Sequence, residues 1–325
     1  MELFAHIFFT SVVPILFLAV IGVFMDRKFT LGLNTLSKLN FYLFLPAFMF
    51  RVFYTTPLTV DSLEIVLCGI FIVFLNYLLG TGLAKLNGYD VKKAAVFRNC
   101  IMFNNGGNIG IAVLTLVYTN EPFLVNGASP HLEAALVAAV ALVIVQNIAT
   151  NTLGFYFAGA GVLSAKDAVR LVFRMPTIYV VPAALLMRLL PFRLENFFLW
   201  PDLNIIANGF VAVAMLALGI QINRTPVDIF SKDVMLATAS RLLLGPLVAL
   251  LAVMLFTTLY APLTNIGAQA VVIMYGVPTA INMALISLEM KNNPEFATQI
   301  VMATTLLSGL TMPLAILLAY HIFPV

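Results

Sequence analysis

The chain has 325 residues, of which 62% are hydrophobic and 10% are charged, and its formal net charge is +3. Soluble domains carry about 25% charged and about 45–50% apolar residues, so this composition excludes an ordinary water-soluble enzyme. Only a lipid bilayer accepts so many apolar side chains, which predicts a polytopic membrane protein. The weak, scattered net charge also argues against a nucleic-acid partner. Continuous apolar runs, rather than alternating ones, favour helices over a transmembrane β-barrel.

Charges, prolines and turn residues divide the chain into ten apolar segments, each long enough for a membrane-spanning helix. We expect spans at 4–24, 32–54, 63–86, 93–118, 133–157, 169–190, 200–222, 234–258, 265–290 and 298–322. The first apolar stretch, Leu3–Met25, lacks the basic start and the small-residue cleavage site of a signal peptide, so we interpret it as the first span. The expected fold class is all-α, with ten transmembrane helices.

The positive-inside rule orients these spans. Of the 17 Lys and Arg residues, all but Arg51, Arg188 and Arg193 fall in or beside the loops on one side of the membrane. That side is therefore predicted to be cytoplasmic, and both termini are predicted to lie on the extracytoplasmic side. The expected location is the cell (inner) membrane, with multiple passes.

The spans form two halves of five, residues 1–160 and 161–325. Because five is odd, the second half enters the membrane upside down relative to the first, which is the condition for an inverted repeat. Helix-breaking residues occur in the fourth span of each half, at Asn104–Asn108 and at Gly276–Pro278. Interrupted spans at corresponding positions of two halves indicate the binding site of a transporter.

The break in the fourth span combines three asparagines with three glycines. They are Asn104, Asn105, Gly106, Gly107, Asn108 and Gly110. Glycine costs about 1 kcal/mol relative to alanine in a helix, and asparagine competes for backbone hydrogen bonds, so local unwinding is expected. Unwound backbone is tolerated in a membrane only inside protein or beside a cavity. Tight packing through Gly106 and Gly110 is the alternative, but it would not require three side-chain amides.

The break in the ninth span contains Gly276 and Pro278, which bend the chain and remove a backbone donor; a simple proline kink is the alternative. If both spans unwind and cross at the midplane, two helix N-termini face one cavity. Neutral donors would come from Asn105, Asn108, Thr279 and Asn282. Such a substrate site favours an anion, most simply a carboxylate.

Other polar or helix-breaking residues are less decisive. The fifth span places four on one helical stripe, either lining the cavity or bonding neighbouring helices: Gln146, Asn147, Thr150 and Asn151. Pro46 is expected to break the second span and bend it toward the cavity. Arg241, in the eighth span, either extends to the cytoplasmic face or helps to draw an anion inward. Without acidic residues near the middle of any span, a relay of protons through buried carboxylates is not expected. No metal site or cofactor is predicted.

The sequences of the two broken spans resemble those of a known family. The string from Asn105 to Ile111 resembles the Asn-x-Gly-Asn-x-Gly-x-Pro pattern of the auxin efflux carrier family. The string from Pro278 to Asn282, followed by Glu289-Met290, is similar to that family's Pro-Pro-Ala-x-Asn…Glu-Tyr crossover. The span count, the five-plus-five layout and the outward termini agree with it as well.

The chain departs from the family pattern at Ala112, Thr279 and Met290, where the family often has proline, proline and tyrosine. It also lacks the long central loop of many plant PIN carriers and is similar to compact bacterial members, which are associated with malate, malonate and related organic anions. The resemblance implies a crossover site in which Asn105 meets the substrate carboxylate and Pro278 is a crossover proline. It also implies a scaffold of spans 1, 2, 6 and 7, a transport unit of spans 3–5 and 8–10, and a homodimer.

The sequence therefore predicts an alternating-access carrier of small organic anions, either mono- or dicarboxylates or auxin-like acids. Moving a monoanion outward across an inside-negative potential is favoured by about 2.3 kcal/mol per 100 mV, so efflux needs no coupling ion. The related bile-acid symporters couple to sodium through acidic residues near the crossover, which this sequence lacks. An anion channel, a sodium-coupled symporter and a transport-inactive sensor are the alternatives. An intramembrane enzyme would need a nucleophile and base, or a metal pair, at membrane depth. The histidines lie near span ends and no acidic pair lies within a span, so an enzyme is not expected.

Overall fold

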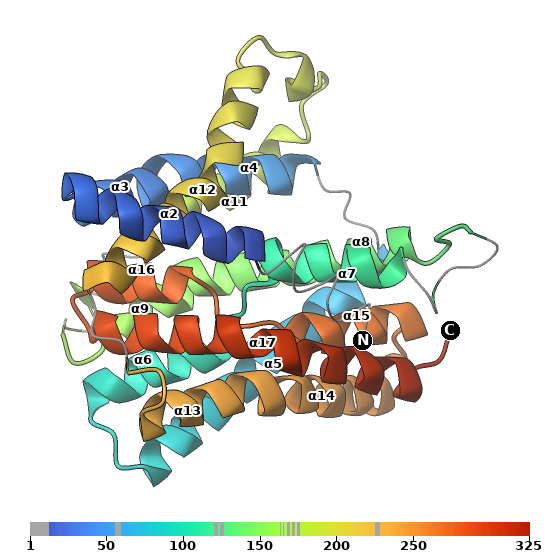
Figure 1. Cartoon of the computed structure of the whole chain (residues 1–325). Helices are drawn as coiled ribbons and strands as arrows, with labels where there is room; N and C mark the ends of the chain where they lie inside the picture. The colour runs from blue at the N-terminus through green and yellow to red at the C-terminus, as the bar shows by residue number, and fades with distance from the viewer. Residues whose placement is uncertain are drawn as a thin grey trace.

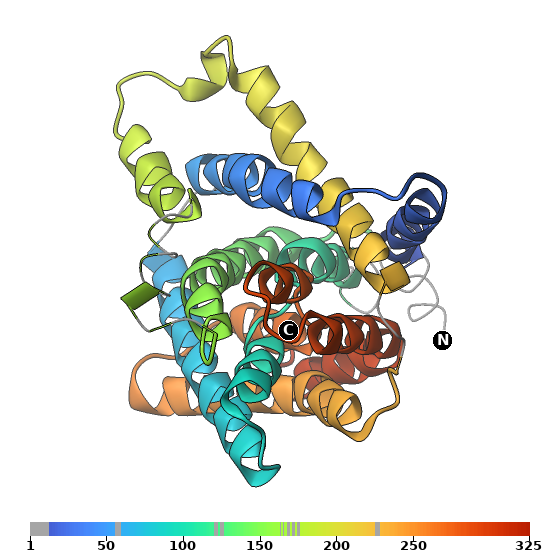
Figure 2. The same cartoon turned by 90° about the vertical axis from the view of Figure 1, so that its left-hand side faces the viewer.

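The structure is a computed structural model that describes residues 13–55, 60–119, 123, 127–162, 164, 166–167, 170, 173, 176–224 and 228–325. Over these residues the protein is helical and contains no β-strand. The first twelve residues, which include the expected start of the first span, lie outside the described part. The helices fall into two groups that are visible in two views (Figures 1 and 2).

The first group, which we name the α12 group, lies at the top of Figure 1. It contains α2 (Val13–Phe29), α3 (Leu33–Leu39), the π-helical turn η2 (Asn40–Phe44), α4 (Leu45–Thr55), α11 (Thr177–Met187) and α12 (Trp200–Arg224). The long helix α12 packs against α2, α3 and α4, and α11 packs against α4. A short 3-10 helix, η5 (Leu194–Asn196), precedes α12. This group brings together elements from both halves of the sequence.

The second group, the α17 group, forms the rest of the molecule. From the first half it contains α5 (Val60–Leu86), α6 (Val91–Met102), η3 (Gly106–Gly110), α7 (Ile111–Tyr118), α8 (Leu132–Ala149), η4 (Thr150–Gly154) and α9 (Phe155–Ala158). From the second half it contains α13 (Lys232–Ala239), η6 (Ser240–Leu244), α14 (Gly245–Leu259), α15 (Asn265–Gly276), α16 (Asn282–Glu289) and α17 (Pro294–Ile322). Helix α17 packs against α15, α16 and α13, and α5 packs against α6, α8 and α14.

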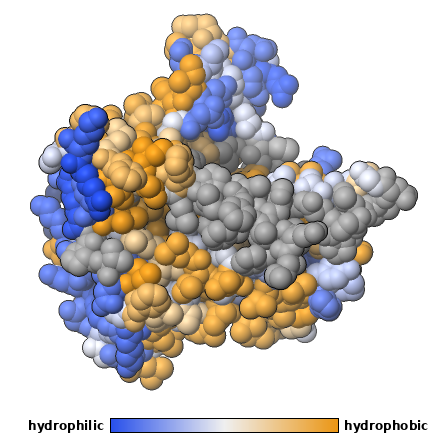
Figure 3. All heavy atoms as spheres, in the orientation of Figure 1, coloured by the Kyte–Doolittle hydropathy of each residue, from blue (hydrophilic) through white to orange (hydrophobic). Residues whose placement is uncertain are grey.

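Many large hydrophobic side chains are exposed on the outer surface. Large hydrophobic side chains are exposed at helical spacing along α17, at Leu306, Leu310, Leu314 and Leu317. Figure 3 shows hydrophobic residues over the middle of one face and hydrophilic residues along the edge where α3 and α6 lie. Soluble proteins rarely expose so many large apolar side chains together, so these side chains are suited to contact lipid.

Five helical stretches in the described residues are long and apolar enough to span a membrane. They are Leu63–Leu86, Leu132–Ala158, Trp200–Arg224, Lys232–Leu259 and Pro294–Ile322. Helices α6 and α15 have 12 residues each. Twelve residues extend about 18 Å, which is shorter than a hydrocarbon core of about 30 Å. The protein is therefore a multi-pass membrane protein by composition and helix length, while the count of ten spans stays a prediction.

Pro46 does not break its helix, contrary to our expectation. The chain is helical from Leu33 to Thr55, and the widened turn η2 lies directly before the proline, with the Leu45 N–H bonded to the carbonyl of Asn40. The same arrangement precedes Pro246, where the Gly245 N–H bonds to Ser240. A proline clashes with the carbonyl four residues before it, and a π-helical turn moves that carbonyl aside.

Glycines allow the contact between α2 and α12. Helices α2 and α12 approach so closely at Gly22 and Gly219 that their backbones touch. A β-carbon added at Gly219 would lie 2.0 Å from the carbonyl oxygen of Ala19, and one at Gly22 would lie 2.4 Å from that of Leu216. Small residues at such positions are the usual means of close helix packing in membranes. The contact packs α2 and α12 closely together.

The same two helices are linked again at their C-terminal ends. The Asp26 carboxylate, which is buried and lies beyond the predicted span 4–24, accepts hydrogen bonds from both Arg224 and Asn223. Arg224 also donates to the carbonyl of Leu31, at 2.6 Å. The hydrogen bond from Arg224 lowers the pKa of the Asp26 carboxyl below its ordinary value, and this outweighs the effect of burial.

We expect Gly219→Ala to destabilise the protein by about 1–3 kcal/mol, because the added methyl group overlaps the α2 backbone. The measurement is the unfolding temperature of the purified protein in detergent. Gly82→Ala is the matched control, since a β-carbon at Gly82 in α5 meets nothing within 4 Å. Equal unfolding temperatures for the two variants would contradict the close contact.

A second prediction follows from Asp26. A carboxyl group whose pKa is lowered by folding stabilises the folded state above its unfolded pKa of about 3.9, and this contribution disappears as the pH falls through the folded pKa. The wild-type protein should therefore lose more stability than Asp26→Asn between pH 6 and pH 3. Unfolding temperatures measured across that range test this. Parallel pH profiles for the two proteins would show that the ion pair is not the cause.

Candidate functional site

Two helices of the α17 group are interrupted. Helix α6 ends at Met102 and the helical conformation resumes at Gly106, so residues 103–105 are not helical. Helix α15 ends at Gly276 and α16 begins at Asn282, so residues 277–281 are not helical. The interruptions overlap the predicted breaks, but in the fourth span only in part: Gly106, Gly107, Asn108 and Gly110, which were expected to break the helix, form the π-helical turn η3. We name residues 103–105 and 277–281 the paired breaks.

The paired breaks bond to each other through their backbones. The Asn105 N–H donates to the carbonyl of Pro278 at 2.8 Å, and the Ala280 N–H donates to the carbonyl of Phe103 at 2.9 Å. Asn104 and Thr279 thereby form an isolated antiparallel bridge. An unpaired backbone group costs several kcal/mol in hydrocarbon. Each break avoids part of this cost because it supplies hydrogen-bond partners for backbone groups of the other break.

Side chains complete the pairing in a reciprocal way. Asn104 donates from Nδ2 to the carbonyl of Met274, in the last turn of α15, at 3.0 Å. Thr279 donates from Oγ1 to the carbonyl of Cys100, in the last turn of α6, at 2.8 Å. The Oδ1 of Asn104 also accepts from the N–H of Gly106. Each break thus caps the end of the helix from which the opposite break emerges.

Arg241 satisfies three further carbonyl groups at the same place. It is fully buried, so it does not extend to the cytoplasmic face, which was one of the two sequence-based expectations. Its guanidinium donates to Val277 at 3.1 Å, to Ile101 at 2.9 Å and to Tyr275 at 2.5 Å. Arg241 comes from the π-helical turn η6 of a neighbouring helix. Three elements therefore meet at the paired breaks.

The glycines of both broken helices allow this close assembly. A β-carbon at Gly110 would lie 2.5 Å from the sulfur of Met274, and one at Gly106 would lie 2.9 Å from its terminal methyl. A β-carbon at Gly276 would lie 2.7 Å from that of Ala315 in α17. The packing role that we considered for Gly106 and Gly110 is thus real. It occurs together with the unwinding rather than in place of it.

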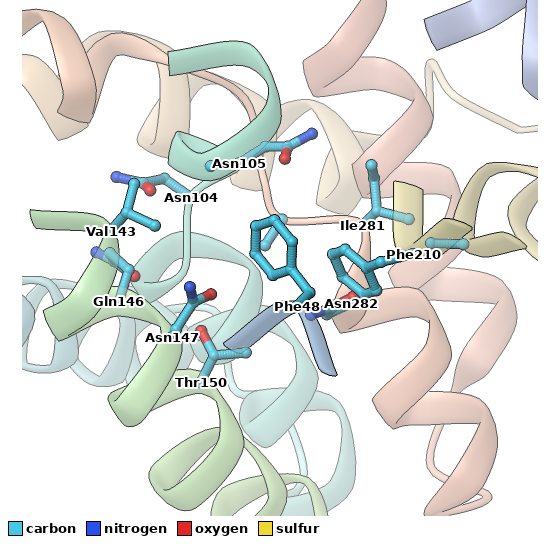
Figure 4. A pocket seen from close by; sticks show the side chains of 13 residues that line it. Phe48, Asn104, Asn105, Val143, Gln146, Asn147, Thr150, Phe210, Ile281 and Asn282 are labelled. Atoms are coloured by element: carbon cyan, nitrogen blue, oxygen red, sulfur yellow. The ribbon is translucent and has the colours of Figure 1, made fainter. Parts of the chain in front are cut away.

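A pocket lies against the paired breaks and between the two helix groups (Figure 4). It is lined by Phe48, Asn104, Asn105, Gly107, Val143, Gln146, Asn147, Thr150, Phe210, Ala214, Ala280, Ile281 and Asn282. Its volume is about 40 Å³, room for about three water molecules. The α17 group supplies all of its amide side chains, whereas the α12 group supplies Phe48, Phe210 and Ala214.

The two walls of the pocket differ in chemistry. Phe48 and Phe210 stack with their ring centroids 5.0 Å apart and form an apolar wall. Opposite them, Gln146 donates to the hydroxyl of Tyr275 at 3.1 Å. The Oε1 of Gln146 and the Nδ2 of Asn147 are buried and make no hydrogen bond within the described part of the chain. Buried amide atoms without partners are costly, so these two are suited to bind a ligand or water.

The pocket is lined by four of the eight residues that the sequence predicts to bind substrate, and Gly106 is not among them. Asn105, Gly107, Asn147 and Asn282 line the pocket, as does Asn104. Pro278 and Thr279 belong to the paired breaks instead, because their polar groups are used in backbone pairing. The side chain of Asn108 lies outside the described part of the structure. The fifth-span residues Gln146 and Thr150 also line the pocket, whereas Asn151 bonds to its own helix.

Some lining residues were not foreseen. Phe48, Phe210 and Ile281 are ordinary apolar residues of long hydrophobic segments, and no local pattern distinguishes them. Only the packing of α4 and α12 against the paired breaks brings the two aromatic rings together.

The electrostatics of the pocket favour a negative ligand. No acidic residue lines it, and the described residues contain no group of three side chains able to hold a metal ion. The helical stretches that begin at Gly106 and at Asn282 both start at the pocket, preceded by Asn105 and Ile281. Helix N-termini carry a partial positive charge and unsatisfied N–H groups. Amides and two helix ends can therefore hold a carboxylate without a countercharge beside it.

Discontinuous membrane helices that meet at a polar pocket are typical of secondary transporters. Residues 7–316 match the model of a family described as membrane transport protein, and the chain therefore belongs to this family, the auxin efflux carrier family. The resemblance drawn from the two broken spans is confirmed by a match over nearly the whole chain. A search of curated proteins found no match.

We expect Thr279→Val to destabilise the protein by about 1–3 kcal/mol, because it leaves the buried carbonyl of Cys100 without its donor while keeping the shape of the side chain. Thr279→Ser keeps the hydroxyl and is the matched control. The unfolding temperatures of the two purified variants in detergent provide the measurement. If the valine variant were as stable as the serine variant, the reciprocal capping would not contribute to stability.

Proposed function

We propose that this protein is an alternating-access transporter of small organic anions, with the pocket at the paired breaks as its substrate site. The observation that carries the proposal is the composition of that pocket. Its polar wall holds amide groups and the starts of two helical stretches, and no acidic residue lines it. A carboxylate is the simplest ligand that accepts hydrogen bonds from all of these donors.

The two walls suggest how a substrate would lie. Its carboxylate would meet Asn105, as the family resemblance implies, together with Asn147 and the start of α16 at Asn282. Its carbon skeleton would contact the stacked rings of Phe48 and Phe210. Compact mono- or dicarboxylates, such as malate or malonate, and auxin-like acids belong to the chemical class that this site would bind, and a relative movement of the two walls would enlarge the pocket for them.

The position of the pocket supports alternating access. One wall belongs to the α12 group and the other to the α17 group, so a relative movement of the two groups would open the pocket to one side or the other. We assign the α12 group, which contains spans 1, 2, 6 and 7, as the scaffold. The α17 group, with spans 3–5 and 8–10, is then the transport unit.

The same proposal includes the full architecture expected from the sequence. The reciprocal bonds of Asn104 and Thr279 support two inverted halves of five spans with crossed fourth and ninth helices. Both termini would lie on the extracytoplasmic side of the cell membrane. The family resemblance implies that the protein forms a homodimer. Efflux of a monoanion would be driven by the membrane potential alone, at about 2.3 kcal/mol per 100 mV.

The direct test is a transport assay in proteoliposomes with a panel of mono- and dicarboxylates. We expect saturable uptake of at least one of them, accelerated by the same anion on the opposite side. Flux that neither saturates nor responds to anion on the opposite side would identify a channel. The absence of flux for the whole panel would favour a sensor without transport activity.

Substitutions at the pocket test the site itself. Asn105→Ala and Asn147→Ala should each lower transport about tenfold or more, since a hydrogen bond to a charged group contributes about 1.5–3 kcal/mol. Asn76→Ala is the control, because Asn76 is a buried amide of α5 that bonds to its own helix and does not line the pocket. Wild-type transport by folded, membrane-inserted Asn105→Ala would remove this assignment of the substrate site.

A further inference from the structure

The proposed substrate site does not explain the environment of Arg241. It lies fully buried among apolar helices and its guanidinium is bonded to three backbone carbonyls. The three ion pairs within the described residues are Lys93–Asp233, Arg193–Glu195 and Arg224–Asp26. Arg241 takes part in none of them. A buried charge of this kind is expensive, so a specific role is expected of it.

The three carbonyls that bind Arg241 lie at or next to the C-terminal ends of helices. Those of Ile101 and Tyr275 lie at the C-terminal ends of α6 and α15, and that of Val277 lies in the adjacent break. Helix C-terminal ends carry partial negative charge. In secondary transporters with broken helices, such carbonyls and helix ends are the ligands of coupling cations. In this chain a side chain of the protein uses them.

The surroundings of Arg241 are shaped for its guanidinium. Gly245, one turn further along, leaves the space that it needs: a β-carbon there would lie 3.4 Å from Cζ of Arg241 and 3.0 Å from the carbonyl oxygen of Tyr275. The ring of Tyr275 lies 5.9 Å from the same Cζ and faces it with its π-electrons. The three carbonyls, the ring of Tyr275 and the space left by Gly245 together form a site that fits a cation.

We propose that Arg241 is a resident cation that takes the place of a coupling ion, so that anion transport by this protein does not depend on Na⁺ or K⁺. This inference rests on the proposed transport function. Arg241 acts as a positioning residue: its charge holds the ends of α6 and α15 together and balances their partial negative charge. A carrier that relied on a bound metal cation would lose this balance whenever the ion left.

The first test uses the wild-type protein in proteoliposomes, with Na⁺, K⁺ or choline as the only monovalent cation on both sides. Transport should be equal within about twofold in the three solutions, because no step recruits a metal cation from solution. A tenfold fall in choline relative to Na⁺ would overturn the proposal. It would show that a coupling cation is still required beside Arg241.

The second test empties the site. Arg241→Ala should leave a cavity lined by three carbonyls and lower transport in choline at least tenfold. Millimolar guanidinium chloride should restore part of the activity, and Arg241→Lys, which keeps a charge, should retain more activity than the alanine variant. Unchanged transport by Arg241→Ala in choline would overturn the proposal, and so would a loss that neither guanidinium nor lysine relieves.

A binding measurement separates this inference from the transport function. The unfolding temperature of purified Arg241→Ala should rise when guanidinium or Na⁺ replaces choline, whereas that of the wild type should not. Arg98→Ala is the matched control, because Arg98 is packed between Tyr77 and Phe157 and its removal opens no cage of carbonyls. If the wild type transports no anion but the shift occurs, the proposed function fails and the cation site stands. An equal response of both variants would contradict the site.

If Arg241→Ala does not fold, the unfolding temperature of Arg241→Lys is measured with the same cations instead. Its ammonium group should remain bound to the carbonyls, so its unfolding temperature should be insensitive to the cation in solution. A rise in the unfolding temperature of Arg241→Lys when Na⁺ replaces choline would overturn the assignment.

Discussion

Backbone groups inside a membrane have no water to bond with, and the rest of this structure depends on how two interrupted helices meet that constraint. Residues 103–105 and 277–281 leave the helical conformation, and each supplies the hydrogen-bond partners of the other. Asn104 and Thr279 extend the exchange to the last turns of α15 and α6. The pocket exists because this pairing allows the chain to unwind at membrane depth.

The two helix groups are held together internally by different means. In the α12 group, the backbone contact at Gly22 and Gly219 fixes α2 against α12. In the α17 group, the paired breaks and Arg241 join elements from both halves of the sequence. Between the groups lies the pocket, with stacked aromatic rings on one wall and amides on the other. Under the proposed function, a relative movement of these two groups would expose the pocket between them in turn to two sides.

Much of this architecture could be predicted from local sequence. The apolar segments follow from hydrophobicity alone, and the unwinding at 103–105 and 277–281 follows from residues that disfavour helices. The prediction of a break at Pro46 was wrong, because a π-helical turn absorbs the proline without ending the helix.

Contacts between distant residues could not be predicted in the same way. The three carbonyls bonded by Arg241 lie 34 to 140 positions away along the chain, and no periodicity encodes such partners. Phe48 and Phe210 are likewise ordinary members of apolar segments until α4 and α12 pack together. The sequence indicated which residues are unusual, whereas the fold determined which of them meet.

The charge of Arg241 has an electrical consequence. It belongs to the group of helices that moves in the proposed mechanism, so an empty pocket leaves one positive charge at the centre of that group, and a bound monoanion neutralises it. Under that proposal the loaded movement would be electrically silent, and the return of the empty protein would be the step on which the membrane voltage acts, with up to about 2.3 kcal/mol per 100 mV. An inside-negative voltage would then draw the empty protein toward the inward-open form of the proposed cycle, in which it loads from the cytoplasm.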